Sequence, residues 1–272
     1  MTQEEELTSE VRDGVLWLII NRADASNAIP FYVRDRLIEH FRAAHADLTV
    51  RCVVLTGAGE RHFCTGSDLR VRPPMAEKPE GAPDYVAGSA VHMMRTGFQA
   101  LMESMQDCQK PVIVALNGTA AGGGAMLTLA ADLVIAADTA KIVDVFGKQA
   151  LIPDGGFMYL LPRIVGTHKA AQIVFLGDAI SAEEAADLGI VNKVVPAAEL
   201  RAATEEWAGR LAAKPTKVLG WAKQLLHEAS ELPRTAVLER EAAFIELNLA
   251  TEDGKERMAA MVEKRDPVWK GW

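Results

Sequence analysis

The aspartate at position 154 lies in the short segment ALIPDGG, residues 150–156. A proline and two glycines around one acid are typical of a tight turn, so Asp154 can be a plain turn residue. A carboxylate that is buried in such a turn can instead take a proton from one carbon of a substrate and return it to another. A free aspartate, with a pKa of about 3.9, is too weak a base for this task, so burial would have to raise its pKa. Asp154 is therefore our first candidate for a proton-transferring residue.

Two turns rich in glycine can supply a complementary group. FCTGSDL (residues 63–69) and AAGGGAM (residues 120–126) each follow an apolar run. Each places a glycine beside an expected helix start, where free N–H groups point outward and bind a negative oxygen. Taken singly, each turn is equally explained by tight turning or close helix packing. Side by side, the two turns would form an oxyanion hole.

The chain has no sequence motif for the common cofactor chemistries. It has no phosphate-binding loop with a Gly-Lys-Ser/Thr end, no His-Glu-x-x-His and no Gly-x-Ser-x-Gly elbow, and its glycines do not form a dinucleotide fingerprint. The net charge of −8, without any run of Lys and Arg, argues against nucleic-acid partners and anionic membrane surfaces. We expect no metal site.

The cysteines and the first residues indicate the compartment. The three cysteines, Cys52, Cys64 and Cys108, have no metal-ligand spacing and suit reduced thiols. The start of the chain, MTQEEELTSE, does not resemble a secretory signal, and no apolar stretch approaches the roughly 20 residues of a membrane helix. We therefore expect a cytoplasmic protein.

Alternating strands and helices must position these turns. VLWLII (residues 15–20) predicts a strand, RCVVLTG (residues 51–57) predicts a second, buried strand, and a helix lies between them. Asn27 is the expected N-cap of that helix, with Pro30 in its first turn. Its apolar stripe is expected to contain Phe31, Leu37, Ile38, Phe41 and Leu48.

The rest of the chain continues this α/β pattern and ends in helices. PVIVALNG (residues 111–118) predicts a strand, followed by a turn, a helix of small residues and another strand. SAEEAADLG (residues 181–189) predicts a capped helix before the strand IVNKVV. Residues 68–93, rich in proline, predict a mobile surface loop of the kind that often covers sites. From about residue 199 the pattern is helical, and these tail helices need a partner, most simply a neighbouring subunit.

Along nearly its whole length the chain resembles the crotonase superfamily, the enoyl-CoA hydratase/isomerase family. Six segments in the family's order carry the resemblance: NRADASNAI, VVLTGAGERHFCTGSDL, KPVIVALNGTAAGGGAMLTLAADLVIAAD, LIPDGGFMYLLPRIVG, LGDAISAEEAADLGIVNKVV and MVEKRDPVWKG. The resemblance implies a crotonase-like spiral of ββα turns over residues 1–198 and a helical oligomerisation region over residues 199–272. It also implies a homotrimer or hexamer and an acyl-CoA thioester as substrate, with coenzyme A as part of that substrate and no further cofactor.

The resemblance also implies roles for individual residues. The family's two oxyanion donors correspond to the backbone N–H groups of Ser67, after Gly66, and of Gly123, after Gly122. In the family, these donors stabilise a thioester enolate, and a further group decides which product forms. In hydratases that group is a pair of glutamates. The matching positions of this chain hold Met126 and Phe146, whose side chains cannot transfer a proton.

The acid at position 154 matches an aspartate that some relatives keep. In dienoyl-CoA isomerases and in epoxyphenylacetyl-CoA isomerases, which are the closest in this pattern, that aspartate transfers a proton; in 4-halobenzoyl-CoA dehalogenases it is a nucleophile. Asp144 is the rival acid, since on an extended strand it would share a face with Phe146. The alternative for Asp144 is a solvated or ion-paired carboxylate.

The coenzyme A end is expected at Asp24, Ala25 and Ser26. Arg22 lies near by in sequence, and Lys264 would come from a neighbouring subunit's tail. Asp24 is acidic where relatives often carry a base, and Arg22 and Lys264 can also be solvated surface charges. Asp68, directly after the first glycine turn, completes the expected substrate-binding residues.

We therefore expect an acyl-CoA enzyme that moves a double bond, or opens a related allylic system, by proton transfer through Asp154. Three alternatives stay open: an enoyl-CoA hydratase that uses Asp144 or a loop residue, a hydrolase or dehalogenase with Asp154 as nucleophile, and a non-catalytic subunit that binds coenzyme A esters. The loop of residues 71–92, with Met126, Phe146 and Phe157, is expected to select the acyl group.

Overall fold

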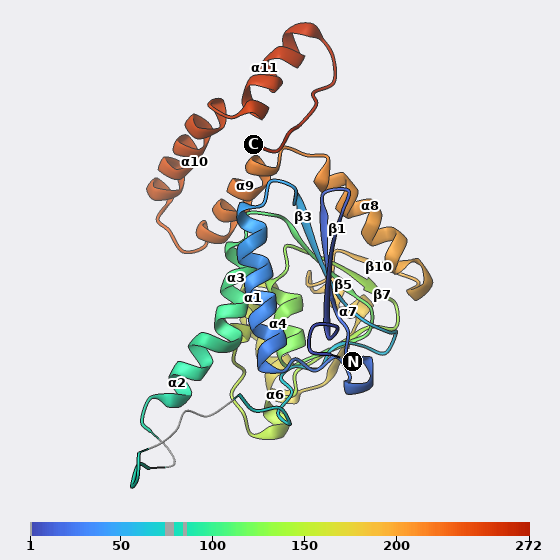
Figure 1. Ribbon diagram of the computed structural model, residues 1–272, viewed down its shortest axis with the longest axis vertical. Helices are drawn as coiled ribbons and strands as arrows, with labels where there is room; N and C mark the ends of the chain where they lie inside the picture. The colour runs from blue at the N-terminus through green and yellow to red at the C-terminus, as the bar shows by residue number, and fades with distance from the viewer. Residues whose placement is uncertain (1, 74–78, 84–85) are drawn as a thin grey trace.

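The computed structural model describes residues 2–73, 79–83 and 86–272, and it has two β-sheets (Figure 1). The larger sheet has the order β1-β2-β3-β5-β7-β10 and the smaller sheet the order β4-β6-β8-β9. The larger sheet contains β1 (Leu7–Arg12), β2 (Val15–Ile20), β3 (Cys52–Gly57), β5 (Val112–Leu116), β7 (Leu133–Ala137) and β10 (Lys193–Val195). The smaller sheet contains β4 (His62–Cys64), β6 (Thr119–Ala121), β8 (Lys141–Val143) and β9 (Ala179–Ser181).

The two sheets are built by a spiral in which successive turns each add one strand to both. The pairs β3 and β4, β5 and β6, and β7 and β8 follow one another along the chain, and within each sheet their members pair in parallel. Helices close the turns: α3 (Ala100–Asp107), α4 (Gly123–Ala130) and α5 (Phe157–Val165). The expected α/β spiral is therefore confirmed, because the apolar runs of β3 and β5 are buried on both faces as a parallel sheet requires.

The first βαβ unit forms as expected, but its helix begins differently. β2 and β3 pair in parallel around α1 (Phe31–Ala46), whose buried face includes Leu37, Ile38 and Phe41. The N-cap is Pro30, with extended backbone, so the prediction that Asn27 caps this helix is wrong. Leu48 lies beyond the helix end and is exposed, so it does not extend the apolar stripe.

The expected surface loop after Asp68 is shorter than predicted. Helix α2 begins at Ser89 and ends at Met94, and the π-helical turn η2 (Arg95–Gln99) joins it to α3. The described residues from 69 to 73 and from 79 to 83 form no helix or strand, and the expectation for residues 74–78 and 84–85 lies outside the described part of the chain.

The remaining helices cover the sheets and form the tail. They are α6 (Thr167–Leu176), α7 (Ala182–Asp187), α8 (Leu200–Ala212), α9 (Thr216–Glu228), α10 (Arg234–Leu249) and α11 (Glu252–Glu263). The expected N-cap of α7 is confirmed, because the Ser181 side chain accepts a hydrogen bond from the Glu184 N–H. Helix α8 packs on the larger sheet, although it follows residue 198, where the spiral region was expected to end. The division of the chain at residue 198 stays a prediction.

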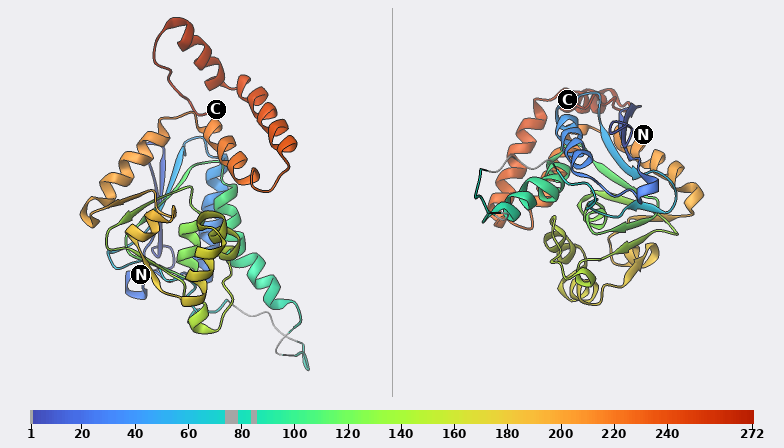
Figure 2. Two further views of the ribbon diagram at one scale, coloured as in Figure 1. Left: turned by 180° about the vertical axis from the view of Figure 1, so that it is seen from behind. Right: turned by 60° about the horizontal axis from the view of Figure 1, so that its bottom comes forward.

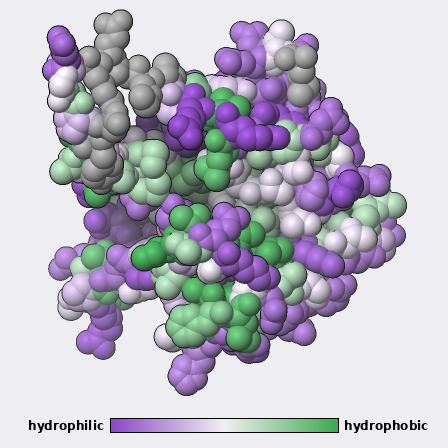
Figure 3. All heavy atoms as spheres, turned by 90° about the horizontal axis from the view of Figure 1, so that it is seen from below, coloured by the Kyte–Doolittle hydropathy of each residue, from purple (hydrophilic) through white to green (hydrophobic). Residues whose placement is uncertain are grey.

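Helices α10 and α11 lie at one end of the molecule and α2 at the other (Figures 1 and 2). Seen from below, the surface mixes hydrophobic and hydrophilic side chains (Figure 3). Ile152 and Phe175 are among the most exposed large apolar residues of the described chain. Within the described residues, no helix is long and apolar enough to cross a membrane.

Candidate active site

The two glycine turns leave neighbouring strands at the same edge of the smaller sheet. Strands β4 and β6 are parallel, and Cys64 pairs with Ala120, so the chain segments that follow them run side by side. A Cβ atom built on Gly66 would lie 3.0 Å from the Gly123 amide nitrogen and 3.2 Å from the Ala121 carbonyl oxygen. Gly66 has a φ of +95°, in the left-handed region that glycine adopts at no steric cost. The two glycine turns therefore lie side by side.

In the first turn, the N–H group of Ser67 lies between residues whose backbone groups form hydrogen bonds with Ile29. Ser67 forms an isolated parallel bridge with Ile29: the Ile29 N–H donates to the Gly66 carbonyl at 2.7 Å, and the Asp68 N–H donates to the Ile29 carbonyl at 2.9 Å. Within the described ranges, the Ser67 N–H itself donates to no acceptor. The expectation of a helix start at this turn is wrong, because the β-bridge holds the turn in place instead.

The second turn does begin a helix. Gly122 is the N-cap of α4 with a φ of +52°, and its N–H donates to the Val143 carbonyl at 3.4 Å. Gly123 is the first residue of α4, and its N–H has no acceptor among the residues that the structure describes. The N–H groups of Ser67 and Gly123 are thus both without an acceptor in the described part of the chain, in two turns that lie side by side.

Asp154 lies in a tight turn and is half-buried at the same time. Gly155 and Gly156 both have positive φ angles, +63° and +95°, and the Phe157 N–H donates to the Asp154 carbonyl at 3.0 Å. Burial raises the pKa of Asp154 above its ordinary value, against the opposing effect of a hydrogen bond from its own backbone N–H. The turn and the perturbed acid are therefore compatible descriptions of one residue.

The side chain of Phe98, from η2, packs against both the Asp154 turn and the second glycine turn. A Cβ atom on Gly123 would lie 2.4 Å from Phe98 Cε1, and one on Gly155 would lie 3.2 Å from Phe98 Cβ. The Gly155 backbone also packs on Met126, with 3.5 Å from the same built position to Met126 Cγ. Sequence reasoning missed Phe98 because a π-helical turn has no recognisable sequence pattern. Its only signal is Gly97, directly before it in an otherwise helical stretch.

Asp144, the rival acid, is buried rather than solvated or ion-paired. Strand β8 ends at Val143, and the Phe146 N–H donates to Asp144 Oδ1 at 2.9 Å, so the expected extended strand through Asp144 and Phe146 is also wrong. Asp144 is 1% exposed, and in the described part of the chain its Oδ2 atom has no hydrogen-bond partner. Burial raises the pKa of Asp144, with smaller opposing effects from the Phe146 N–H and Lys148.

The apolar residues at the two glutamate positions are both enclosed. Met126 is fully buried in α4, and Phe146 packs against Phe157 with 5.9 Å between ring centroids. Phe157 is the first residue of α5 and follows the Asp154 turn directly. The turn that carries Asp154 is therefore followed by an apolar residue and packs on Met126 through Gly155.

Asp68 is occupied by contacts within the protein. Its carboxylate is 2.9 Å from Arg22 Nη1 and 2.9 Å from Arg70 Nε, and Arg22 Nε is 3.0 Å from Glu6 Oε2. Hydrogen bonds from Arg70 first, and from Arg22, lower the pKa of Asp68 to about 2 despite its burial. The alternative of a solvated surface charge is wrong for Arg22, which is buried.

The expected coenzyme A segment meets the first glycine turn at one residue, but Lys264 does not. The Thr65 Oγ1 donates to the Ser26 carbonyl at 3.1 Å, so Ser26 lies against the first glycine turn. Asp24 is exposed. Lys264 is exposed at the end of α11, which lies far from α4 in the same chain (Figures 1 and 2).

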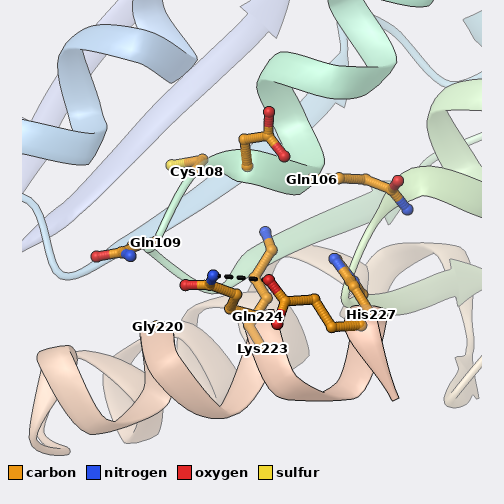
Figure 4. A pocket seen from close by; sticks show the side chains of 9 residues that line it. Gln106, Cys108, Gln109, Gly220, Lys223, Gln224 and His227 are labelled. Carbon is orange, nitrogen blue, oxygen red and sulfur yellow. Dashed lines mark hydrogen bonds between the residues drawn. The ribbon is translucent and has the colours of Figure 1, made fainter. Parts of the chain in front are cut away.

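Other cavities lie away from these residues. Figure 4 shows one of about 250 Å³ between the end of α3 and α9, where Gln224 donates to Glu228. Lys223, on its wall, is buried and paired with Asp132 at 2.8 Å. A second cavity, of about 750 Å³, lies between the larger sheet and α8. Within the described residues, no group of three or more His, Cys, Asp and Glu side chains could hold a metal ion.

Comparison with known proteins gives one consistent family. The model of the family Enoyl-CoA hydratase/isomerase matches residues 10–272. The 1,2-epoxyphenylacetyl-CoA isomerase of Escherichia coli K12 is 37% identical over 267 residues, which cover 98% of this chain and 99% of that protein. The carnitinyl-CoA dehydratase of Proteus mirabilis is 34% identical over 279 residues, with all of both chains covered.

A solved structure agrees with these relatives. The crystal structure of an enoyl-CoA hydratase from Bacillus anthracis superposes with a TM-score of 0.87 at 30% identity, covering 98% of this chain and 100% of that one.

Proposed function

Because the chain belongs to the enoyl-CoA hydratase/isomerase family, within the crotonase superfamily, we propose that it is an acyl-CoA isomerase in which Asp154 moves a proton. The observation that carries this proposal is the position of Asp154. It is a half-buried acid with a raised pKa, joined through Gly155 and Phe98 to the Gly123 turn. Its isomerase-named relative supports extending the proposal to related allylic systems, such as an epoxide on an aromatic acyl group.

The oxyanion turns stabilise the intermediate. The thioester oxygen accepts hydrogen bonds from the N–H groups of Ser67 and Gly123, and these strengthen as negative charge develops there. Removal of one such donor costs about 10²–10³ in rate in other enzymes. Both donors are fixed by the backbone, one by the β-bridge to Ile29 and the other by the start of α4.

Asp154 then moves the proton in two balanced steps. Its carboxylate takes a proton from the α-carbon of a 3-enoyl thioester, and the C–H electron pair forms the dienolate whose oxygen the two N–H groups hold. The resulting carboxylic acid returns the proton to the γ-carbon, so that the double bond moves from C3=C4 to C2=C3. One acid suffices, and no cofactor beyond the coenzyme A of the substrate is needed.

Met126 and Phe146 favour isomerisation over hydration. Neither side chain can position or activate a water molecule. A specific observation keeps hydration as the second candidate, because Asp144 is a buried acid whose Oδ2 atom is unpartnered in the described residues. The dehydratase-named relative fits that candidate equally well.

The test offers 2-enoyl-CoA and 3-enoyl-CoA separately to the purified protein and to its Asp154→Asn variant. Conversion of the 3-enoyl ester by the native protein, lost in the variant, supports isomerisation. Rapid hydration of the 2-enoyl ester that survives in the variant contradicts it. Transfer of ¹⁸O from labelled water into Asp154 during one turnover would instead identify a nucleophile, and binding of the esters without turnover a non-catalytic subunit.

The assembly is also part of the proposal. Exposed apolar side chains on the tail helices support contacts with further copies, and they include Leu238, Ile245, Leu249, Met261 and Val262. A homotrimer, single or paired, would bring Lys264 of one subunit toward the coenzyme A segment of another. Analytical ultracentrifugation tests this assembly, and a monomer would contradict it. We also propose a cytoplasmic location, which suits the three free cysteines.

A further inference from the structure

The side chain of Phe98 lies against both halves of the proposed active site. Its Cε1 and Cζ atoms are 2.4 and 2.8 Å from the point where a Cβ atom on Gly123 would lie. Its own Cβ atom is 3.2 Å from the corresponding point on Gly155, the residue after Asp154. One side chain therefore contacts both the oxyanion turn and the turn that carries the acid.

We propose that Phe98 is a further residue that selects the acyl group, admitting flat, unbranched acyl chains and excluding those branched next to the reacting carbons. This inference rests on the proposed function, since it takes the thioester oxygen to lie at the Ser67 and Gly123 N–H groups. The α- and γ-carbons must then reach from Gly123 to Asp154, the residue before Gly155, and Phe98 lies against both of these glycines. A flat acyl chain can lie along the ring, whereas a methyl branch would collide with it.

Met102 packs beside Phe98 and contacts the next glycine of the Asp154 turn. Phe98 and Met102 are four residues apart, so they lie on one face of the helical segment. The Met102 Cε atom is 2.7 Å from the point where a Cβ atom on Gly156 would lie. This face therefore packs on both glycines that follow Asp154, and Phe98 is partly buried against the core.

The backbone beneath Phe98 is irregular. Within residues Arg95–Gln99 the helix is kinked, because Gly97 departs from helical geometry with a φ of −94° and a ψ of −119°. Gly97 is buried, and a Cβ atom there would lie 3.2 Å from Arg34 Nη1. Phe98 follows this kink directly, so its side chain lies against the glycines at the point where the regular helix is interrupted.

The chemistry of the ring agrees with this role. Phenylalanine has no hydrogen-bond donor or acceptor, so it cannot take part in the proton transfer. It offers only shape and an apolar surface, which are the properties that discriminate between acyl groups of different width. A hydrophobic site distinguishes substrates that differ by one methylene by roughly tenfold or more.

The experiment uses two substitutions with opposite expected effects, Phe98→Ala and Phe98→Trp, both made in the Asp154→Asn protein so that no turnover occurs. Isothermal titration calorimetry gives the affinities for butanoyl-CoA and for 3-methylbutanoyl-CoA. We expect Phe98→Ala to raise the affinity for the branched ester relative to the straight one by about tenfold. We expect Phe98→Trp to lower the same ratio.

Phe175→Ala is the matched control, because Phe175 is an exposed phenylalanine of α6 and should leave the ratio unchanged. An unchanged ratio in both Phe98 variants, or a shift in the same direction in both, overturns the proposal. If Phe98→Ala does not fold, Phe98→Leu replaces it with the same expected direction. Isomerase activity is measured separately, in the protein that keeps Asp154. If that protein has no isomerase activity but the affinity ratio shifts in the Phe98 variants, only the proposed function is contradicted. Intact isomerase activity with an unshifted ratio contradicts only the role of Phe98.

Discussion

A methyl group on Gly66 would lie 3.0 Å from the amide nitrogen of Gly123, so the two proposed oxyanion donors stand on backbones in direct contact. A real Cβ atom almost never approaches another heavy atom more closely than this. Any side chain at position 66 would therefore push the two turns apart. The separation of the donors is set by the absence of a side chain.

Gly66→Ala should lower kcat by about 10²–10³, the cost of one displaced oxyanion donor. The control is Gly81→Ala, because Gly81 also has a positive φ of +79° but a Cβ atom there would meet nothing within 4 Å. Both variants carry backbone strain, and only the first disturbs the donors. Steady-state kinetics on an enoyl-CoA separates them, and equal kcat values in the two variants would count against the oxyanion role.

Asp154→Asn should lower kcat by about 10²–10⁴ with little change in KM, since the amide keeps the shape of the carboxyl group but can neither accept nor return a proton. Asp178→Asn is the matched control, because Asp178 is an exposed aspartate outside the site. Following the movement of the double bond by absorbance gives both parameters. A large rise in KM at constant kcat would place Asp154 in binding rather than in proton transfer.

As the pH is lowered, the native protein should lose activity at a higher pH than an ordinary aspartate would give, because burial raises the pKa of Asp154 and its carboxylate form is the base. Activity therefore rises with pH through this range, whereas the contribution of Asp154 to stability falls. A folded-state pKa above the unfolded value means that the folded protein binds more protons, so stability falls as pH rises from the unfolded to the folded pKa. Asp154→Asn removes this loss, and urea unfolding from pH 4 to pH 7 should show a flatter dependence in the variant.

Asp144→Asn should leave stability at neutral pH unchanged or raised. The amide oxygen can still accept the Phe146 N–H, and a buried group that resists ionisation is replaced by a neutral one. Asp144→Ala should cost about 1–3 kcal/mol, because it leaves the Phe146 N–H without its acceptor. Chemical denaturation compares the two. A larger loss in Asp144→Asn than in Asp144→Ala would mean that the carboxylate is charged and paired.

Asp68→Asn should destabilise the protein by about 3 kcal/mol, the low end for a broken buried ion pair, because Arg22 keeps Glu6 as a partner. Arg70 and Arg22 hold the pKa of Asp68 at about 2. This contribution to stability is present above the unfolded pKa and disappears as pH falls toward about 2. Unfolding midpoints between pH 4 and pH 2 should therefore depend less on pH in the variant than in the native protein.

The sequence predicted the central strands well because burial on both faces leaves a continuous apolar run, as in β3 and β5. It missed β1 because only Leu7 of that strand is buried, which leaves no alternation to read. Strands β4, β6, β8 and β9 have three residues each, too few for any period. These short strands are nevertheless the ones that bring the two glycine turns together.

Single polar residues were harder to place than elements. Asn27 looked like a helix cap, but its side chain accepts from the Arg22 N–H and donates to the carbonyls of Ala58 and His62. Asp144 looked solvated, because an acid next to a strand end usually is. Both assignments depend on residues distant in sequence or on burial, which local patterns do not contain.

The packing of Phe98 and Met102 on Gly155 and Gly156 has a consequence for mutational tolerance. A survey of every single substitution would find functional loss not only at Asp154 but also at neighbours that carry no chemical group. At Gly66, Gly123, Gly155 and Gly156 even alanine is expected to be poorly tolerated, while exposed Asp24 should accept most residues. The positions that tolerate no substitution would then include the glycines around the site as well as its acid.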